Sequence, residues 1–545
     1  MNQPQRSGSV LVASGILLSR LAGLIRESVL SRVLGLSQAA VAVAAAVRIP
    51  NLLQNLLGEG VLSASFVPVY SQLLDEDDER EASRVAGAVA GSLMVVVGSG
   101  VTVLVLLAEP ITRLLAFGLP DETFELTGDL TRIMALGIGF LVLSAWCLGV
   151  LNSHRRFFLS YAAPVVWNAV QIVVLLAVWA LDWELDDAAR ALAWALTAGG
   201  LAQLLVQLPT TLRLARGVRL HLGRDDPQVA EVRRRFLPAV LGRGVIQLSA
   251  YLDLLLASFL AGGALAALLK AQLLYTLPVS LFAMSVAAAE LPELSRLTDD
   301  PRAMADRSTD GLRRIAFLML LATLLYVAAG DLIVAVLFQG GRFDGTDTVL
   351  VWLVLAAYAI GLPAVGTSRM LQNVCFAAGD TAGPARIATV RVAVSATLGL
   401  LLMFPLDRVI VGPDGLEGLG EVFGLAGPLD EATRSMDTVR LGAVGLALGS
   451  AVAAWVELSL LSVLATRHLP GVEHPMHTLR RPATAAAIAF LATAVVKLVV
   501  GDLPALVAAG VTVGTGVTVY AVTAFRTGVD ESRLLLTPAR RLIWR

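Results

Sequence analysis

The stretch AGAVAGSLMVVVGSGVTVLVLLA, residues 86–108, contains no charged side chain. A helix needs about 20 predominantly apolar residues to cross the hydrocarbon core of a bilayer. Runs of similar character occur at 315–338 and 483–500. The chain of 545 residues is 56% hydrophobic and only 16% charged, with a mean hydropathy of +0.75. Soluble domains are closer to about 25% charged. The sequence therefore predicts an all-α polytopic membrane protein.

Fourteen transmembrane helices are expected along the chain, and the first is not preceded by a cleavable signal sequence. Their ranges are 9–33, 38–58, 85–108, 128–151, 160–181, 188–214, 236–261, 264–290, 311–338, 347–376, 384–405, 440–467, 481–500 and 504–526. Arginine is concentrated in alternate loops, above all 213–235 and 293–314. Because positive loops stay in the cytoplasm, both termini are predicted to be cytoplasmic.

The two halves of the chain resemble each other at a period near 225 residues. EPITRLLAFGLPDETFELT (109–127) matches DLIVAVLFQGGRFDGTDTV (331–349), and Pro68 falls over Pro292. Six helices per copy give both copies the same orientation, as in transporters that bind substrate near mid-membrane between two parallel repeats. The alternative is a duplicated scaffold that transports nothing.

This repeat divides the chain into three predicted parts. Residues 1–218 and 219–470 are two six-helix lobes, and 471–545 holds two additional helices and a cytoplasmic tail.

The first helix, SGILLSRLAGLIRESVLSRVLG (14–35), carries charges within the predicted membrane segment. At 100° per residue one arc contains Ser19, Arg20, Gly23, Arg26 and Glu27, and leucines occupy the opposite face. Arg20 and Arg26 are separated by about 9 Å along the axis. Both could therefore bind one extended anion such as a diphosphate, because guanidinium groups bind phosphate oxygens bidentately. Pairing of an arginine with Glu27 is the alternative.

The second helical element, VRIPNLLQNLLGEGVLSASFVPVY (47–70), contains Glu59 between Gly58 and Gly60. Gln54 contributes to its polar side. Two glycines permit a break beside the carboxylate. The break is interpreted either as a gate with a buried carboxylate or as a plain helix end with an exposed one.

The second half also has ionisable residues in or near predicted spans. They are Arg243, Asp253, Lys270, Glu290, Arg369, Arg391 and Glu457. Asp253 occupies the repeat position of Arg26 and could bind a coupling cation or pair with an arginine.

The remaining motifs are weak. Gly87/Gly91 and Gly445/Gly449 indicate close helix packing. His474 and His477 have no companion ligands, so we expect no metal site. Cys147 and Cys375, within predicted spans, are interpreted as small apolar residues.

Neither a phosphate-binding glycine loop nor a nucleophile–base pair is evident, and we expect no enzyme activity.

LLSRLAGLIRE (17–27) and RIPNLLQNLLGEGVLSASFVPVY (48–70) resemble the opening of the MurJ (MviN) family. LNSHRRFFLSYAAPVVWN (151–168) and the segment 337–388 match its patterns as well. The resemblance covers about residues 1–470 and implies the multidrug/oligosaccharidyl-lipid/polysaccharide exporter fold.

Members of this family flip lipid II, the undecaprenyl-diphosphate-linked peptidoglycan precursor, to the outer leaflet by alternating access. The resemblance implies that Arg20 and Arg26 are cavity arginines for the diphosphate and that Glu59 is the family's glutamate. Ser19 and Gln54 complete the predicted substrate site. It also implies that the last two helices form a groove for the lipid tail.

The chain departs from the family pattern at several site positions. Gln54 and, within AQLLYTLP (271–278), Gln272 with Leu273 stand where the family has two further arginines, and Val41 replaces an aspartate. The compensating cations would be Arg243, Lys270 or Arg391.

The sodium site described for the family is only partly present. Asp253 is kept, Ser450 stands for a threonine, and Ser395 and Gly399 stand for other polar ligands. Either Na+ or the membrane potential is the expected driving force, and no other cofactor is expected.

Four hypotheses follow, of which the first is a lipid II flippase in the bacterial cytoplasmic membrane. The others are a flippase for another polyprenyl-diphosphate-linked glycan, a cation-coupled small-molecule exporter, and a non-transporting scaffold. Membrane lipids and cell-wall synthesis proteins are the expected partners, and nucleic acid is not.

Overall fold

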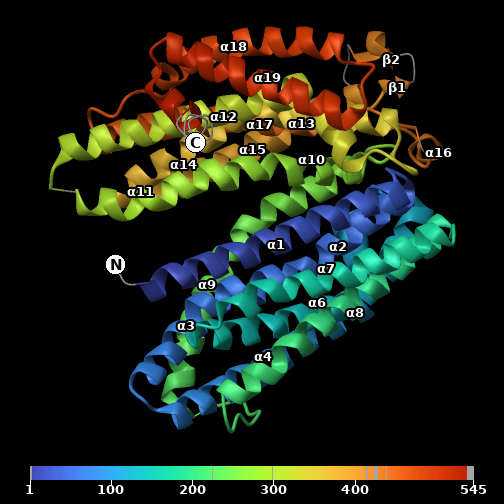
Figure 1. Cartoon of the computed structure of the whole chain (residues 1–545). Helices are drawn as coiled ribbons and strands as arrows, with labels where there is room; N and C mark the ends of the chain where they lie inside the picture. The colour runs from blue at the N-terminus through green and yellow to red at the C-terminus, as the bar shows by residue number, and fades with distance from the viewer. Residues whose placement is uncertain are drawn as a thin grey trace. The chain divides into compact units, whose positions relative to one another are not determined.

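A computed structural model describes the chain from residue 3 to residue 536, except for residues 224, 298, 413–414, 423–426 and 437. The side chains of residues 3–14, 16, 241–250 and 421–422 also lie outside the described part. The described chain is helical almost throughout, with one short antiparallel hairpin (Figure 1). The chain forms two compact units, Met1–Phe259 with Gly340–Phe343, and Leu260–Gln339 with Asp344–Arg545.

The helices of the first unit are α1 (Gln3–Leu34), α2 (Gln38–Leu57), α3 (Glu59–Asp75), α4 (Glu79–Leu106), α5 (Ala108–Leu115), α6 (Asp121–Ser153), α7 (Phe157–Ala180), α8 (Leu185–Leu214) and α9 (Pro227–Ala257). The second unit begins with α10 (Ala264–Pro278), the π-helical turn η1 (Val279–Ala283), α11 (Met284–Arg296), α12 (Pro301–Phe338), α13 (Gly345–Ile360), α14 (Leu362–Ala377) and α15 (Ala382–Leu406). It continues with β1 (Ile410–Gly412), β2 (Gly415–Glu417), η2 (Leu419–Val422), α16 (Glu431–Arg434), α17 (Gly442–His468), α18 (Pro475–Val499), α19 (Ala505–Arg526) and η3 (Asp530–Ser532).

All fourteen predicted spans fall on long helical segments. Three of these segments are interrupted: α2–α3, α10–η1–α11 and α13–α14. In the described part of the chain, twelve segments are long and apolar enough to cross a membrane. The twelve do not include α1 and α9, although these helices have 32 and 31 residues. The prediction of an all-α polytopic membrane protein is confirmed.

In the first unit, α6 packs against α2, α3, α4 and α8. It is buried along most of its length, and Leu130, Met134 and Ile138 are fully covered. Polar side chains join α6 to α8: Ser144 donates to Gln207 at 2.5 Å, and Gln203 donates to Ser144 at 2.9 Å. These bonds satisfy polar groups that would be costly to leave unpaired in an apolar interior.

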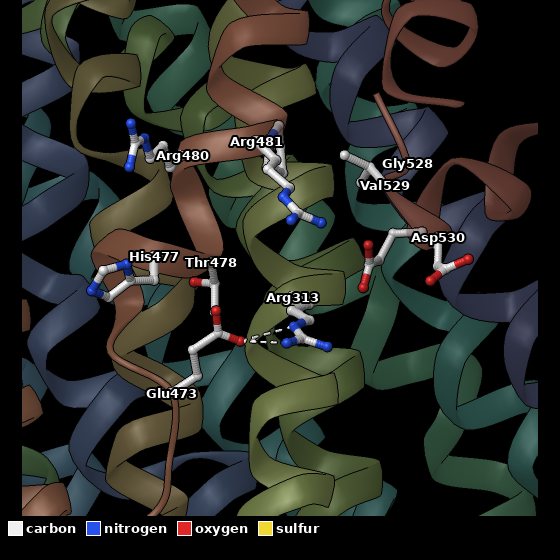
Figure 2. A pocket seen from close by; sticks show the side chains of 11 residues that line it. Arg313, Glu473, His477, Thr478, Arg480, Arg481, Gly528, Val529 and Asp530 are labelled. Atoms are coloured by element: carbon white, nitrogen blue, oxygen red, sulfur yellow. Dashed lines mark hydrogen bonds and ion pairs between the residues drawn. The ribbon is translucent and has the colours of Figure 1, made fainter. Parts of the chain in front are cut away.

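In the second unit, α15 packs along α17, and α18 and α19 pack on each other and on α12. Tyr520 of α19 stacks on Phe317 of α12 and donates its hydroxyl to the Phe317 carbonyl at 2.8 Å. The loop before α18 is tied to α12 by Glu473, which accepts two hydrogen bonds from Arg313 (Figure 2). The last two helices are therefore fixed on the second unit rather than free of it.

The second helical segment of each predicted copy is interrupted at a comparable place. The first break separates α2 from α3 at Gly58, and the second is the π-helical turn after Pro278. Pro68 and Pro292 then lie within α3 and α11. The compact units divide after Phe259, because α9 packs on α2 and α3, whereas the predicted lobes divide after residue 218. The sequence repeat and the compact units are thus different divisions of the chain.

The two glycine pairs have different roles. A Cβ on Gly445 would lie 2.7 Å from the Met403 nitrogen, and one on Gly449 would lie 2.6 Å from the Gly399 nitrogen, so this pair permits the predicted close helix packing. Gly87 and Gly91 instead face the backbone of an extended loop, at the carbonyls of Arg219 and His221. The prediction of helix packing was wrong for that pair, because the neighbour is a loop.

The cysteines and histidines of interest also have defined surroundings. Cys147 and Cys375 are free and buried. His474 is the N-cap of α18 and accepts a hydrogen bond from the Met476 amide at 3.3 Å.

Candidate functional site

The charged face of α1 packs along α7, and small residues allow the two helices to approach. A Cβ on Gly15 would lie 2.8 Å from the Tyr161 Cβ, and one on Gly23 would lie 3.9 Å from the Asn168 Oδ1. The apolar face of α1 is exposed, as Leu17, Leu21 and Ile25 show. We call this α1–α7 contact the α1–α7 seam. These exposures separate the two predicted faces of α1 only in part, because Arg20 on the polar arc is exposed as well.

Arg26 lies at the α1–α7 seam and is partly buried. Its guanidinium is 5.0 Å from the centre of the Trp167 ring, and it is 3.5 Å from the Glu27 carboxylate. The Arg26 and Glu27 side chains are 22% and 15% exposed, so solvent screens the pair only partly. A cation over a tryptophan face is favourable by about 0.5–2 kcal/mol, depending on desolvation. Arg26 is thus held in place by an anion and by an aromatic ring.

Arg20 and Ser19 lie further toward the N-terminus of the same helix. Arg20 is exposed, and Ser19 is half-buried. Both belong to the polar arc that the helical projection predicted. Of the two predicted arginines, Arg26 is therefore partly buried and Arg20 is exposed on the surface of its unit.

Asn168 has an unsatisfied buried oxygen at the α1–α7 seam. Its Nδ2 donates to the Pro164 carbonyl at 2.9 Å, but its Oδ1 has no hydrogen-bond partner among the described residues. The residue is only 4% exposed. Buried polar atoms are normally paired, and an exception requires an explanation. The Asn168 Oδ1 faces Gly23, which has no side chain. This oxygen can therefore accept a hydrogen bond from a ligand or from a side chain that moves toward it.

The break at Gly58 matches the prediction, but its carboxylate differs from the buried interpretation. Gly58 ends α2, where a Cβ would collide with the Gln54 carbonyl. Glu59, the first residue of α3, is exposed, and Gln54 is half-buried. Glu59 acts electrostatically on Tyr161 of α7, so it lies near the α1–α7 seam. The structure brings Glu59 and the polar face of α1 to the same helix, α7.

A second polar cluster lies in the second unit, around a buried carboxylate. Glu457 of α17 is 3% exposed and lies 2.8 Å from an Arg391 guanidinium nitrogen of α15. Gln372 of α14 donates to the other carboxylate oxygen at 3.2 Å, and Arg369 donates to Gln372 at 3.2 Å. These four side chains link three helices. Arg391 therefore has an internal counter-ion.

The other predicted site residues of the second unit are spread over several helices. Lys270 of α10 is 4% exposed, with its Nζ 5.6 Å from the centre of the Phe338 ring. Ser395 of α15 and Ser450 of α17 are both half-buried, and the Ser395 carbonyl lies beside Gly449. Gln272 donates to the Tyr358 hydroxyl at 3.0 Å.

Two predicted site residues belong to α9 of the first unit. Asp253 is half-buried. The side chain of Arg243 lies outside the described residues.

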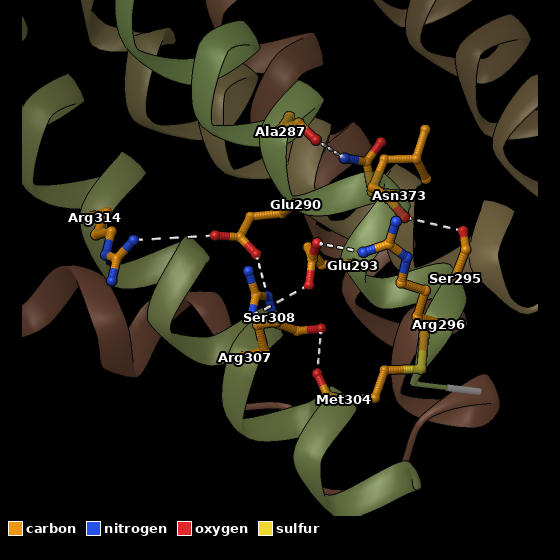
Figure 3. A network of polar contacts seen from close by, with 11 residues as sticks. Ala287, Glu290, Glu293, Ser295, Arg296, Met304, Arg307, Ser308, Arg314 and Asn373 are labelled. Carbon is orange, nitrogen blue, oxygen red and sulfur yellow. Dashed lines mark hydrogen bonds and ion pairs between the residues drawn. The ribbon is translucent and has the colours of Figure 1, made fainter. Parts of the chain in front are cut away.

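Glu290 belongs to an ionic network at the arginine-rich end of the second unit (Figure 3). It accepts a hydrogen bond from Arg307 at 2.6 Å and lies 4.0 Å from Arg314. Arg296 pairs with Glu293 in the same network. Asn373 donates to the Ala287 carbonyl at 2.6 Å, which ties α14 to α11. Glu290 thus joins α11 to α12 at the end of the spans.

Sequence reasoning did not assign a role to α7, although this helix forms half of the α1–α7 seam. Tyr161, Trp167 and Asn168 all lie in one predicted apolar span, 160–181. The polar residues Asn168 and Gln171 in such a span were an available signal. Helical projection identifies which face is polar, but it does not identify the neighbouring helix.

Comparison with known proteins agrees with this architecture. Residues 30–412 match the family model described as "Lipid II flippase MurJ". The "Probable lipid II flippase MurJ" of Bdellovibrio bacteriovorus is 33% identical over 405 residues, which cover 72% of this chain and 76% of that protein.

Two solved structures are also similar. One, described as "Lipid II flippase MurJ, inward closed conformation", has a TM-score of 0.72 at 20% identity and covers 94% of this chain and 98% of its own. An inward-facing multidrug resistance MATE family transporter of the MOP superfamily has a TM-score of 0.59 at 14% identity, over 84% and 98% of the two chains. These likenesses concern the fold. With the family model matching more than half of its length, the chain belongs to the lipid II flippase MurJ family.

Proposed function

We propose that this chain moves lipid II from the inner to the outer leaflet of the bacterial cytoplasmic membrane by alternating access. The observation that carries the proposal is membership of the family over residues 30–412. A helical bundle with twelve apolar spans in the described residues is consistent with transport. The proposal includes cytoplasmic termini, which rest on the arginine-rich loops.

In this proposal Arg20 and Arg26 bind the diphosphate, with Ser19, Gln54 and Glu59 nearby in the substrate path. Arg26 is partly engaged by Glu27 and Trp167, so it stays oriented when no substrate is bound. Diphosphate oxygens would compete with Glu27 for the guanidinium. A charge-assisted hydrogen bond contributes about 1.5–3 kcal/mol, enough for a tenfold change in affinity or more.

The arginines missing from the family pattern are not simply replaced by neighbouring cations. Arg391 is bound to Glu457, and Lys270 is buried against Phe338. We therefore assign most of the binding free energy for the diphosphate to the α1–α7 seam. Asp253 is the proposed carboxylate ligand of a coupling Na+, with the membrane potential as the other driving force.

A flippase for another polyprenyl-diphosphate-linked glycan is the second candidate. It is favoured by Gln54 and Gln272, which are uncharged hydrogen-bonding residues where the family has arginines. Amides suit sugar hydroxyls better than they suit phosphates.

The test is an assay of lipid II accessibility at the outer leaflet, in a bacterium whose own flippase is depleted and which carries only this chain. The wild type is expected to restore outer-leaflet lipid II and growth. Arg20→Ala and Arg26→Ala should each reduce the rate by roughly tenfold, because each removes charge-assisted bonds to phosphate. Arg216→Ala, at an exposed loop arginine, is the matched control and should remain active.

Two outcomes have different meanings. A protein present in normal amounts that restores neither outer-leaflet lipid II nor growth would contradict the lipid II assignment and favour the other glycan. Full activity of both Arg20→Ala and Arg26→Ala, with normal amounts of protein in the membrane, would reject the role of the α1–α7 seam but leave the transport function standing.

A further inference from the structure

A polar pocket of about 380 Å³ lies in the second unit, between α12, α18 and the turn that follows α19 (Figure 2). Its volume falls within the roughly 300–1,000 Å³ of small-molecule sites. The charged residues that line it include Arg313, Arg481, Asp530 and Glu531. We call it the α18–α19 pocket. None of these residues takes part in the α1–α7 seam.

The α18–α19 pocket is placed where three helices reach the end of their apolar stretches. Arg313 precedes the apolar run 315–338 of α12, and Arg481 precedes the run 483–500 of α18. Gly528 follows the end of α19 at Arg526. A pocket at this depth lies level with lipid headgroups, on the side that the arginine-rich loops mark as cytoplasmic.

The arginines of the pocket keep donors available. Arg481 is exposed, and its guanidinium forms no hydrogen bond or ion pair with the described part of the chain, although its carbonyl accepts a hydrogen bond from Thr484. Arg313 uses its Nε and Nη2 for Glu473, at 2.9 and 2.7 Å, which leaves Nη1 for another acceptor. Figure 2 shows Arg481 reaching toward the 528–531 turn, and Arg480 also lines the pocket. Two guanidinium groups can therefore bind one phosphodiester.

The carboxylates of the pocket lie on the other wall, in the turn after α19. Glu531 is half-buried, and Asp530 is exposed and has a weak ion pair with Arg533 at 3.2 Å. Arg313 is already paired with Glu473, so the other lining cations, Arg480 and Arg481, are opposed by the carboxylates of Asp530 and Glu531. A purely anionic ligand would meet these carboxylates and be repelled. A ligand with a phosphate and a nearby ammonium group would satisfy both walls.

We propose that the α18–α19 pocket binds a phosphodiester that carries a primary ammonium group, the headgroup chemistry of phosphatidylethanolamine. Arg481 and the Nη1 of Arg313 hold the phosphate, and Asp530 and Glu531 accept hydrogen bonds from the ammonium. The source is a membrane lipid rather than a soluble phosphodiester, because the pocket opens where the apolar stretches begin. This site is separate from the proposed path of the transported lipid.

The experiment is native mass spectrometry of the full-length protein, released from detergent with equimolar phosphatidylethanolamine, phosphatidylcholine and phosphatidylglycerol of identical acyl chains. We expect phosphatidylethanolamine occupancy to exceed that of the other two by roughly fivefold, the effect of one net hydrogen bond. Phosphatidylcholine has the same charges but no N–H donor, so it isolates the ammonium contacts. Glycerophosphoethanolamine is added in a separate arm as the soluble source.

Three variants separate the two walls. Arg481→Gln should lower the occupancy of phosphatidylethanolamine and phosphatidylglycerol together, and Arg302→Gln, at an exposed arginine of α12 that does not line the pocket, should leave both unchanged. Asp530→Asn with Glu531→Gln should remove the preference for phosphatidylethanolamine over phosphatidylcholine while phosphate binding remains. This double variant keeps the proposal testable if Arg481→Gln does not fold.

Four results would overturn the proposal. These are equal occupancy of the three lipids, a preference for phosphatidylglycerol, equal effects of Arg302→Gln and Arg481→Gln, and an unchanged preference in the Asp530/Glu531 variant. Displacement of the lipid by millimolar glycerophosphoethanolamine would reject the membrane source.

Discussion

At the scale of single residues, the Arg391–Glu457 pair is the most informative contact of the second unit. Glu457 is almost fully buried, so removing its partner leaves an uncompensated charge. We predict that Arg391→Gln lowers the free energy of unfolding by about 3 kcal/mol, the usual cost of breaking a buried pair. Thermal unfolding of the purified protein in detergent measures the change.

The double variant Arg391→Gln with Glu457→Gln is the control for this prediction. It should recover most of the lost stability, because two neutral amides replace two charges and still have Gln372 beside them. A double variant as unstable as Arg391→Gln alone would contradict the assignment of Arg391 as an internal counter-ion.

Asp407, the first residue after α15, gives the protein a predicted pH dependence. Burial raises its pKa to about 7, although the Ala261 amide at 3.1 Å and the cations Arg440 and Arg434 lower it. Its pKa in the unfolded chain is about 3.9. The native state therefore binds more protons between pH 4 and 7, and stability falls as the pH rises through this window, by up to about 1.4 kcal/mol per pH unit.

Asp407→Asn tests this dependence, because the amide is neutral at every pH and its oxygen can still accept from Ala261. Thermal unfolding between pH 5 and pH 8 should show a stability that declines in the wild type and changes less in the variant. Parallel curves for the two proteins would mean that Asp407 does not titrate in this range.

At the scale of elements, the α1–α7 seam depends on one glycine more than on the other. A methyl group on Gly15 would approach the Tyr161 Cβ at 2.8 Å, whereas one on Gly23 would meet only the Asn168 oxygen at 3.9 Å. We predict that Gly15→Ala destabilises the protein by about 1–3 kcal/mol through overpacking. Gly23→Ala should be neutral or stabilising, because alanine favours a helix by up to about 1 kcal/mol over glycine.

Comparing the thermal unfolding of these two variants of one helix removes differences in helix propensity from the result. Equal stability of Gly15→Ala and Gly23→Ala would show that α1 does not pack on α7 in the membrane as it does here.

The sequence predicted the elements better than their neighbours. All fourteen predicted spans fall on helical segments, and 100° periodicity placed Arg26 and Glu27 together on the polar arc of α1. It did not reveal Trp167 beneath Arg26, or Glu457 opposite Arg391, because contacts between distant segments depend on how the helices pack. The Gly58 break was predictable because glycine spacing is a local property.

At the scale of the whole molecule, orientation in the membrane is the main prediction. Ala230, in the first turn of α9, and Ser435, directly after α16, are exposed and lie on opposite sides by the arginine rule. In intact cells a membrane-impermeant maleimide should label Ser435→Cys, and it should label Ala230→Cys only after permeabilisation. Wild-type protein is the control, because Cys147 and Cys375 are buried. The reverse pattern would place the termini outside.

The contact of Gly87 and Gly91 with the loop at Arg219 and His221 predicts which positions vary among related proteins. The helix meets the loop through main-chain carbonyls, which every amino acid possesses. Substitutions of the loop side chains should therefore have little effect on stability. A methyl group at either glycine would instead collide with the loop backbone and displace the loop. Among related genes, variation should accumulate at 219 and 221 while 87 and 91 remain fixed.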